Sequence, residues 1–209
     1  MNTTDDMRNS IYGDHLPELE AVRTQLVDEI QKIREQILQE RGMDPVEHCL
    51  SRIKSEESMR EKCRRNGLPE TTESALEKIN DAVGIRVVCA FLSDVYVIRD
   101  YLANLPNVEL LEEKDYIRHA KPNGYRSYHM ILRVNGKVHA EIQLRTISQD
   151  TWAALEHQMR YKQTTGSNDA LICAELKRCA DELASTDVSM QTIRDMIREA
   201  KCESEEEKK

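Results

Sequence analysis

The segment Glu141-Ile142-Gln143-Leu144-Arg145-Thr146 ends a stretch in which apolar and polar residues alternate. The apolar positions are Val138, Ala140, Ile142 and Leu144, and the polar positions between them are His139, Glu141, Gln143 and Arg145. A period of two predicts a β-strand with one apolar face and one polar face. An exposed antiparallel strand explains the alternation by itself. A carboxylate, an amide and a guanidinium in succession can also bind a metal ion, a base edge and a phosphate, so the strand is a candidate for a functional site.

The sequence before this strand predicts its hairpin partner. Residues 121–129 read Lys-Pro-Asn-Gly-Tyr-Arg-Ser-Tyr-His and lead into a first strand, and Asn135-Gly136 is a strong signal for a hairpin turn. If this turn has two residues, His129 pairs with Ile142 and lies on the opposite face from Glu141. A bulge would be needed to bring the histidine and the carboxylate to the same face.

Composition bounds the class of protein. The chain has 209 residues, of which 39% are hydrophobic, and this length suits one domain with extensions. No apolar run is long enough to cross a bilayer, the first residues lack the apolar core of a signal peptide, and the six cysteines include no C-x-x-C pair. We therefore expect a cytoplasmic protein with no membrane partner.

Charge is unevenly distributed along the chain. The net charge of −8 argues against non-specific nucleic-acid binding as the main activity. Between residues 114 and 145, however, seven lysines and arginines stand against only Asp115 and Glu141. A solvated basic face explains such a stretch, and so does a site for a polyphosphate ligand.

Helical patterns flank the strands. The first covers residues 16–41 and has one apolar stripe made of Leu19, Val22, Leu26, Ile30, Ile33 and Ile37. Asp44-Pro45 reads as the start of a short helix through Leu50, and Ser55 as the N-cap of a helix ending near Gly67. Further helices are expected at 72–79, 94–105 and after Thr146, where Trp152 should lie in the core. The last helical segment has apolar stripes from Ile172 to Ile197, and residues 203–209 are expected to form a disordered acidic tail.

Two shorter segments carry residues suited to phosphate chemistry. Residues 85–91 predict a buried strand, and Asp81 and Gly84 precede it, where a carboxylate can hold magnesium and a glycine lets a nucleotide approach. A turn residue is the simpler interpretation of Asp81 alone. Five cations near the helix that starts at Ser55 can grip phosphate, although an ordinary charged helix explains them as well: Arg52, Lys54, Lys62, Arg64 and Arg65.

The order of these motifs resembles the RelA/SpoT synthetase family, in particular its small single-domain alarmone synthetases. The motifs are Arg52-Ile53-Lys54-Ser55, Asp81-x-x-Gly84-x-Arg86, the segment from Lys121 to His129, and Glu141 to Thr146 followed by Trp152 and Glu156-His157. The resemblance implies an α/β (α+β) fold in which helices flank a mixed β-sheet, related to nucleotidyltransferases. It also implies a synthetase domain at 51–163, a helical extension at 1–50, and a second helical extension with the acidic tail at 164–209.

The resemblance implies a GTP/GDP pyrophosphokinase. Such an enzyme transfers the β,γ-pyrophosphate of ATP to the 3′-hydroxyl of GTP or GDP and yields (p)ppGpp and AMP in the stringent response. Asp81 and Glu141 would hold Mg²⁺, with Glu141 also the candidate base. ATP would be bound by Arg52 and Arg86 around the adenine and by Lys54, Ser55 and Lys62 at the phosphates. GTP or GDP would be bound by Tyr125, stacked on guanine, together with Lys121, His129 and Gln143.

The resemblance further implies a homotetramer with a possible regulatory guanine nucleotide. No His-Asp pair of the family's hydrolase occurs in the chain, and ribosome docking is not expected. Two other classes of function stay open: a nucleotidyltransferase-like enzyme with a different acceptor, and a non-catalytic nucleotide- or RNA-binding module. Tyr125, as a guanine platform, argues against the first, and the pair Asp81 and Glu141 argues against the second, because an anion binder gains little from two carboxylates.

Overall fold

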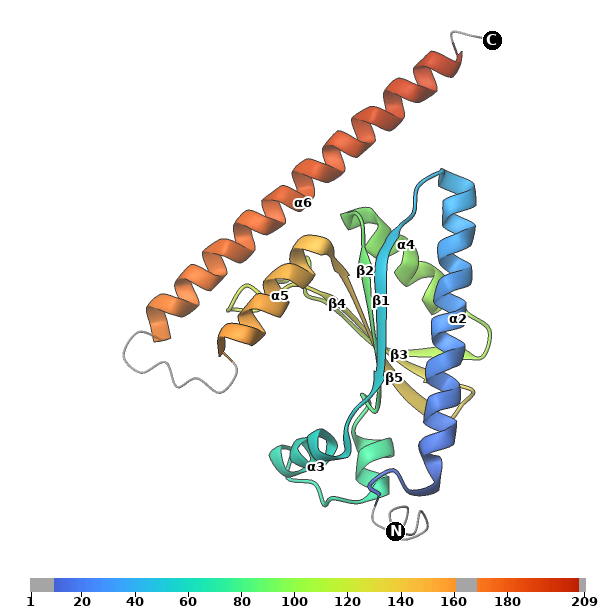
Figure 1. Cartoon of the computed structure of the whole chain (residues 1–209), viewed down its shortest axis with the longest axis vertical. Helices are drawn as coiled ribbons and strands as arrows, with labels where there is room; N and C mark the ends of the chain where they lie inside the picture. Colours follow the sequence, from blue (N-terminus) through green and yellow to red (C-terminus); the bar gives the residue numbers. More distant parts are fainter. Residues whose placement is uncertain (1–9, 161–168, 207–209) are drawn as a thin grey trace.

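The structure is a computed structural model that describes residues 10–160 and 169–206, and it consists of one sheet with helices packed on its two faces (Figure 1). In chain order the elements are η1 (Gly13–His15), α2 (Leu16–Arg41), β1 (Val46–Ile53), α3 (Glu56–Arg65), η2 (Ser74–Lys78), β2 (Val83–Cys89), α4 (Leu92–Ala103), β3 (Val108–Asp115), β4 (Tyr128–Val134), β5 (Val138–Thr146), α5 (Ile147–Arg160) and α6 (Asp169–Glu206).

The five strands lie in the order β1-β2-β5-β4-β3. β2 and β5 are parallel, and every other neighbouring pair is antiparallel. The sheet is therefore mixed, as predicted. The single parallel pair is possible because the chain between β2 and β5 passes through α4, β3 and β4 before it returns beside β2.

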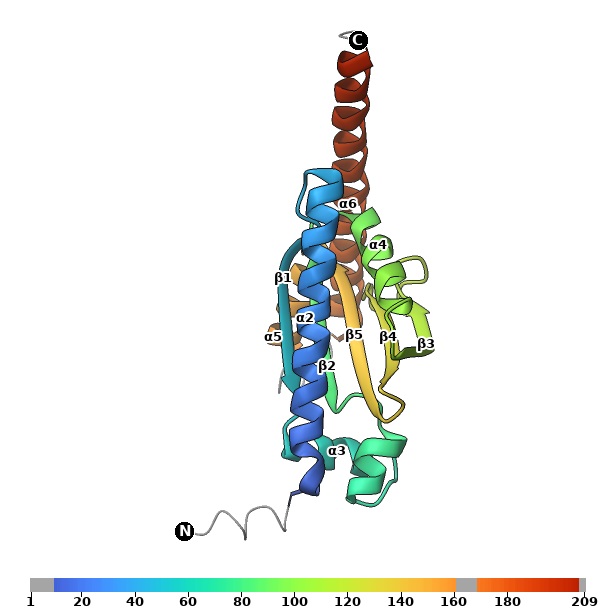
Figure 2. The same ribbon diagram turned by 90° about the vertical axis from the view of Figure 1, so that its right-hand side faces the viewer.

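Helices α2 and α4 cover one face of the sheet. The apolar residues of α2 that the sequence pattern identifies are all buried: Leu19, Val22, Leu26, Ile30, Ile33 and Ile37. They pack with the apolar face of β5, whose Ala140, Ile142 and Leu144 are fully buried. Figure 2 shows α2 lying along the strands, and Gly42 ends it in the left-handed conformation with φ of 67°. The apolar stripe of α2 is thus covered by other residues of the same chain.

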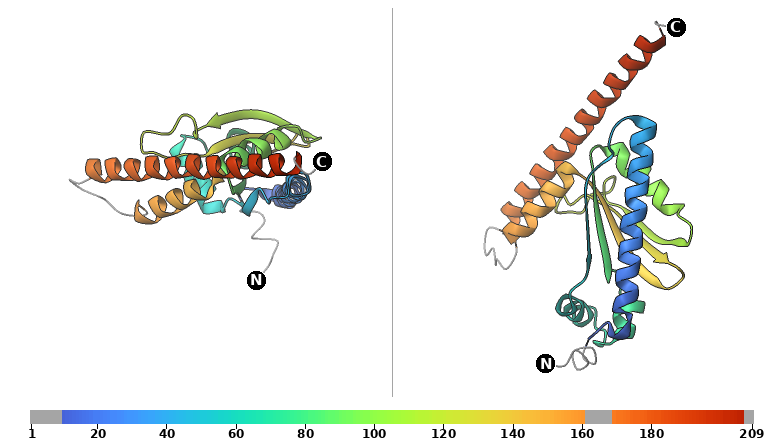
Figure 3. Two further views of the ribbon diagram at one scale, coloured as in Figure 1. Left: turned by 90° about the horizontal axis from the view of Figure 1, so that it is seen from above. Right: turned by 45° about the vertical axis from the view of Figure 1, so that its right-hand side comes forward.

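Helices α5 and α6 pack against each other on the other side of the molecule (Figure 3). Trp152 is only 5% exposed and joins Leu176 and Ala180 in a second, smaller core. The C-terminal half of α6 extends beyond the sheet, and Met190, Ile193 and Ile197 remain exposed there. α6 reaches Glu206, so the prediction of disorder from residue 203 is wrong for four residues, and residues 207–209 lie outside the described part.

The short helix predicted from Asp44-Pro45 to Leu50 is wrong, because this segment is the edge strand β1. Asp44 does not cap a helix: it accepts hydrogen bonds from the Arg34 guanidinium and from the backbone N–H of Val46. The carbonyl of Pro45 accepts from the N–H of Ala90, which starts the pairing with β2. Proline is tolerated at the start of an edge strand, where its missing N–H costs no ladder bond.

The hairpin turn contains the extra residue that is needed to bring His129 and Glu141 to the same face of the sheet. Asn135 and Gly136 have φ of 52° and 72°, as a type I′ turn requires, and Lys137 N–H donates to the carbonyl of Val134 at 3.1 Å. The ladder nevertheless pairs Val134 with Val138, which leaves Lys137 as an extra residue. This shift pairs His129 with Gln143, so His129 lies on the same face of the sheet as Glu141.

Among the described residues, no helix combines the length and the apolarity that a membrane span requires.

Candidate active site

One face of the sheet carries polar residues from three neighbouring strands, the edge strand β1 and the inner strands β2 and β5. Arg52 of β1 pairs with Gly84 of β2, which in turn pairs with Glu141 of β5. Two residues further along, Arg86 pairs with Gln143. Because paired residues and residues two apart project to the same face, these side chains share one surface. It is the face opposite to α2.

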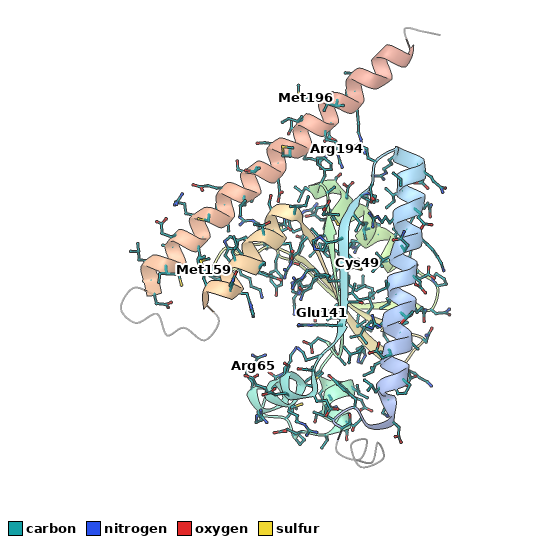
Figure 4. The ribbon with its side chains drawn as sticks, viewed as in Figure 1. Cys49, Arg65, Glu141, Met159, Arg194 and Met196 are labelled. Carbon is teal, nitrogen blue, oxygen red and sulfur yellow. The ribbon has the colours of Figure 1, made fainter. Side chains whose placement is uncertain are left out.

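A cavity of about 170 Å³ lies over this face. Figure 4 shows Glu141 on the sheet, between α3 with Arg65 and the helices α5 and α6. The cavity brings together six of the predicted site residues, and its wall consists of Leu50, Ser51, Arg52, Lys54, Asp81, Gly84, Ile85, Arg86, Glu141 and Gln143.

Asp81 lies just before β2 and joins the strand to α3 through two lysines. Lys54 Nζ and Lys62 Nζ each donate to Asp81 Oδ2 at 2.6 Å. Lys62 is on α3, whose N-terminus is capped by Ser55, and Lys54 follows directly after β1. The second carboxylate oxygen, Oδ1, is buried and has no hydrogen-bond partner. An unpaired buried carboxylate oxygen is costly, which marks Asp81 as a residue that needs a further cationic partner.

Glu141 belongs to a closed ring of five hydrogen-bonded side chains. Its Oε1 lies 3.1 Å from His129 Nδ1, and His129 Nε2 lies 2.8 Å from the Tyr125 hydroxyl. Arg145 donates to that hydroxyl at 2.7 Å and to Gln143 Oε1 at 2.9 Å. Gln143 closes the ring by donating to Glu141 Oε2 at 3.1 Å.

The carboxylate fixes one proton position in the ring. An ionised carboxylate only accepts, so His129 Nδ1 carries a proton and donates to Glu141 Oε1. Burial would raise the pKa of Glu141, but the hydrogen bonds from His129 and Gln143 and the charges of His129 and Lys62 outweigh it and lower the pKa to about 2. Glu141 is therefore a fixed negative charge at neutral pH.

Asp81 and Glu141 fit a magnesium ion. Both line the same cavity, their oxygens are the hard ligands that Mg²⁺ prefers, and Asp81 Oδ1 lacks a partner. In the described part of the chain no group of three or more His, Cys, Asp or Glu side chains could hold a metal. Two carboxylates with the remaining positions left to water and phosphate oxygens is the usual arrangement for Mg²⁺ at a nucleotide.

Tyr125 lies on the side of the hydrogen-bonded ring that is remote from the cavity. Aromatic and cationic groups surround its phenol ring. Its ring centroid is 6.2 Å from that of Tyr116 and 6.4 Å from that of Trp152. Lys121 Nζ is 4.9 Å from the same centroid, and Arg145 Cζ is 5.2 Å from it. An electron-rich ring between two cations is well suited to stacking on a planar base.

Five predicted site residues are not part of the cavity wall: Lys62, Tyr125 and His129, which are described above, and Ser55 and Lys121. Ser55 caps α3 by accepting from the N–H of Ser58 at 3.3 Å, so its hydroxyl is occupied by the helix. Lys121 is exposed beside Tyr116 and Tyr125. The predicted basic stretch is largely neutralised, since six of its seven cations pair with carboxylates: Lys114, Arg118, Arg126, Arg133, Lys137 and Arg145.

Three neighbours of the site were not predicted from the sequence as site residues. Arg145 is 4% exposed and holds Tyr125 and Gln143. Asp150 Oδ1, on α5, accepts a hydrogen bond from Arg145 Nη1 at 3.1 Å and lies 3.3 Å from Arg86 Nη1. Burial and the nearby Arg145 lower the pKa of Arg86, and Asp150 opposes them. Tyr116 lies edge-on to His129. Arg145, on the polar face of its strand, had a sequence signal, whereas Asp150 and Tyr116 had none.

Comparison with solved structures places this fold in one class. A GTP pyrophosphokinase family protein from Streptococcus pneumoniae superposes with a TM-score of 0.78 at 30% identity over 96% of this chain and 97% of that one. The small alarmone synthetase 1 from Bacillus subtilis, solved with its product pppGpp, gives 0.75 at 28% identity over 88% and 96%. The fold is therefore that of the small alarmone synthetases.

Sequence comparison identifies the family. Residues 51–166 match the region found in RelA / SpoT proteins. The GTP pyrophosphokinase YwaC of Bacillus subtilis is 40% identical over 162 residues, which are 73% of this chain and 76% of that protein. The chain belongs to the RelA/SpoT family, and the resemblance inferred from its four motifs is confirmed.

The low pKa of Glu141 predicts an acid-dependent loss of stability. Its pKa falls from 4.5 to about 2 on folding, so its contribution is complete above about pH 4.5 and is lost as the pH drops toward 2. We expect up to ~3 kcal/mol of unfolding free energy to depend on this group, and Glu141→Gln to remove that dependence. Urea unfolding at pH 7, 5, 4 and 3 measures it.

Glu182→Gln, on an exposed carboxylate of α6, serves as the control and should follow the wild type at each pH. Parallel pH curves for the wild type and Glu141→Gln would contradict the assignment.

Proposed function

We propose that this chain is a GTP pyrophosphokinase, an alarmone synthetase that transfers the β,γ-pyrophosphate of ATP to the 3′-hydroxyl of GTP or GDP and releases AMP. The observation that carries the proposal is the meeting of Asp81 and Glu141 in one cavity between a cationic half and an aromatic half. The names of the relatives support it, since they are GTP pyrophosphokinases and one related structure contains pppGpp. We also propose residues 51–163 as the synthetase domain, with α2 completing its core.

The donor half is suited to ATP. Arg52 and Arg86 come from adjacent strands and line the same cavity, where two guanidinium planes can enclose an adenine. The Arg86 side chain is 37% exposed and lines the cavity, so a ligand there can contact its guanidinium. Lys54 and Lys62 would hold the phosphates, exchanging Asp81 for phosphate oxygens as the nucleotide binds. Ser55 is proposed to act through its place at the start of α3.

The acceptor half is suited to a guanine nucleotide. Tyr125 provides the stacking surface, and Lys121 beside it provides a charge for the acceptor phosphates. His129 and Gln143 lie between Tyr125 and Glu141 and would orient the ribose. The acceptor hydroxyl is thereby directed toward the carboxylate and the donor phosphates, which is the positioning that pyrophosphoryl transfer requires.

Glu141 is proposed both to hold the metal and to receive the proton of the 3′-hydroxyl. A carboxylate with a pKa of about 2 is a strong ligand but a weak base. The base role therefore requires that the hydrogen bonds from His129 and Gln143 are released when substrates bind, which would raise the pKa. Mg²⁺ held by Asp81 and Glu141 would offset the charge of the polyphosphate. The direct test is incubation with Mg²⁺, ATP and, in turn, GTP, GDP or GMP, with identification of products.

The carboxylate pair should be essential for turnover. Glu141→Gln and Asp81→Ala are each expected to lower the rate at least ~100-fold, because each removes a metal ligand and the first also removes the base. Rates are measured with ATP and GDP across a magnesium series, and circular dichroism checks the fold. Asp100→Ala, at an exposed position of α4, is the control. Near-normal rates with unchanged magnesium dependence in either variant would show that the roles are wrong.

The two bases should be recognised separately. Tyr125→Ala is expected to raise KM for the guanine nucleotide and to leave KM for ATP nearly unchanged, and Arg86→Ala should do the reverse. Loss of base stacking is worth ~1–3 kcal/mol, which corresponds to a KM change of roughly five- to 150-fold. Steady-state kinetics with each substrate varied in turn measures both values. Equal effects of both variants on both substrates would contradict the separation.

We propose further that the protein is a homo-oligomer, most simply a tetramer, joined through α5 and α6. The stripe of α2 is buried within the chain, so it does not contribute an unsatisfied face. Nine of the fourteen large exposed apolar residues in the described part of the chain lie instead on the two C-terminal helices, as Figure 4 shows for Met159 and Met196. These nine are Ile147, Leu155, Met159, Leu171, Val188, Met190, Ile193, Met196 and Ile197. Apolar surface of this extent on a folded chain is typical of an interface between subunits.

Sedimentation velocity at micromolar concentration should give an oligomer, and Ile193→Asp should shift it toward monomer, because the introduced charge would be buried in the interface. Thr192→Asp, on the neighbouring exposed position, is the control. Added guanine nucleotide tests for a regulatory site through any change in the distribution. A monomer in every condition would rule out the oligomer.

A further inference from the structure

Helix α6 touches the loop that carries Tyr125. Gly124 has φ of 93°, and a Cβ placed on it would lie 2.7 Å from Ala180 Cβ and 3.1 Å from Lys177 Cα. Such distances leave no room for a side chain, so the backbone of the loop lies directly on the helix. The glycine before Tyr125 is therefore required by a contact with α6 as well as by its own positive φ.

A charged pair fixes the other side of Tyr125 to the same helix. Arg126 donates from one guanidinium nitrogen to Asp181 Oδ1 at 2.8 Å and from another to the carbonyl of Gly124 at 3.2 Å. The Arg126 side chain is 17% exposed and the Asp181 side chain 45%, so the arginine is held in place mainly on its protein side while solvent reaches the carboxylate. Lys177 and Arg126 together lower the pKa of Asp181. Arg126 thus ties the backbone on both sides of Tyr125 to one turn of α6.

The ring of Tyr125 is supported from behind by α6 through Trp152. The Trp152 indole N–H donates to the carbonyl of Leu176 at 2.8 Å, and the Trp152 ring packs against Leu176 and Ala180. The same ring is a neighbour of Tyr125 at 6.4 Å between centroids. The loop backbone, the following arginine and the neighbouring aromatic ring all meet α6 between residues 176 and 181.

We propose that α6 is a positioning element of the acceptor site, in which the Arg126–Asp181 pair and the contact of Gly124 with Ala180 hold Tyr125 in place for the guanine nucleotide. The proposal rests on the proposed function, since it takes Tyr125 as the guanine platform. Arg126 and Asp181 act through Tyr125 and do not contact the reacting atoms.

The test is a double-mutant cycle with a matched control. Arg126→Gln and Asp181→Asn are each expected to raise KM for GDP roughly three- to tenfold, with KM for ATP and kcat within twofold of the wild type. The double variant should be no worse than either single variant, because both remove the same interaction. Glu182→Gln removes the neighbouring Arg178 pair on the solvent side of α6 and should leave both KM values unchanged.

A second readout does not depend on turnover. Trp152 is the single tryptophan of the chain, so its fluorescence reports GDP binding in the absence of ATP. The Kd from this titration should rise in Arg126→Gln and Asp181→Asn by the same factor as KM, while melting temperatures identify any general loss of structure.

The outcomes separate the two claims. If the wild type gives no pyrophosphorylated guanine nucleotide, the proposed function fails. If the wild type is active and Asp181→Asn behaves like Glu182→Gln, or if the two single effects add in the double variant, the positioning role of α6 is wrong. Equal increases in KM for GDP and ATP would also overturn it, because a general structural defect would produce them.

Discussion

The parallel pairing of β2 with β5 is the constraint on which the rest of the site depends. It sets Gly84 beside Glu141 and Arg86 beside Gln143, and so joins a cationic half built from β1, β2 and α3 to an aromatic half built from β4 and its loop. A shift of one residue in this ladder would turn Glu141 away from Asp81 and toward the core. The register is held by burial, because Ile85, Val87, Ile142 and Leu144 fill the opposite face under α2. Packing on one side of the sheet thereby fixes the chemistry on the other.

The charges of the site are held in place by two different arrangements. Asp81 is neutralised by Lys54 and Lys62, which are groups that a polyphosphate can draw away from it. Glu141 is held by hydrogen bonds from His129 and Gln143, and these are in turn held by Tyr125 and Arg145. On the proposed assignment, the first arrangement would respond to the charge of the donor nucleotide, and the second to an acceptor bound at Tyr125. Each substrate would then change the surroundings of one carboxylate, although both carboxylates line one cavity.

Most of this architecture could be predicted from local patterns, and the failures have physical reasons. The stripe of α2, the strand at β2 and the alternation of β5 all depend on burial of apolar side chains. The spacing of those side chains can be read from a single sequence. Asp44-Pro45 is equally compatible with a helix start and with an edge strand. The strand forms because Asp44 accepts from Arg34 and Pro45 accepts from the N–H of Ala90, and both donors are distant in sequence. The hairpin shift depends on one extra residue, Lys137, which the turn signal does not record. Asp150 could not be identified as a site residue because its partners, Arg86 and Arg145, are defined only once the sheet is formed.

The surroundings of Tyr125 indicate how an acceptor would enter. Lys121 and Arg145 both lie within about 5 Å of the ring centroid, but they differ in freedom. Arg145 is 4% exposed and bound to three other side chains of the site, whereas Lys121 is exposed. On the proposed assignment, a guanine that stacks on Tyr125 takes the place of the Lys121 ammonium, because displacing Arg145 would break its hydrogen bonds to Asp150, Gln143 and the Tyr125 hydroxyl. The released lysine is then free to follow the acceptor phosphates, so one exchange both opens the stacking surface and supplies the charge that the bound nucleotide needs.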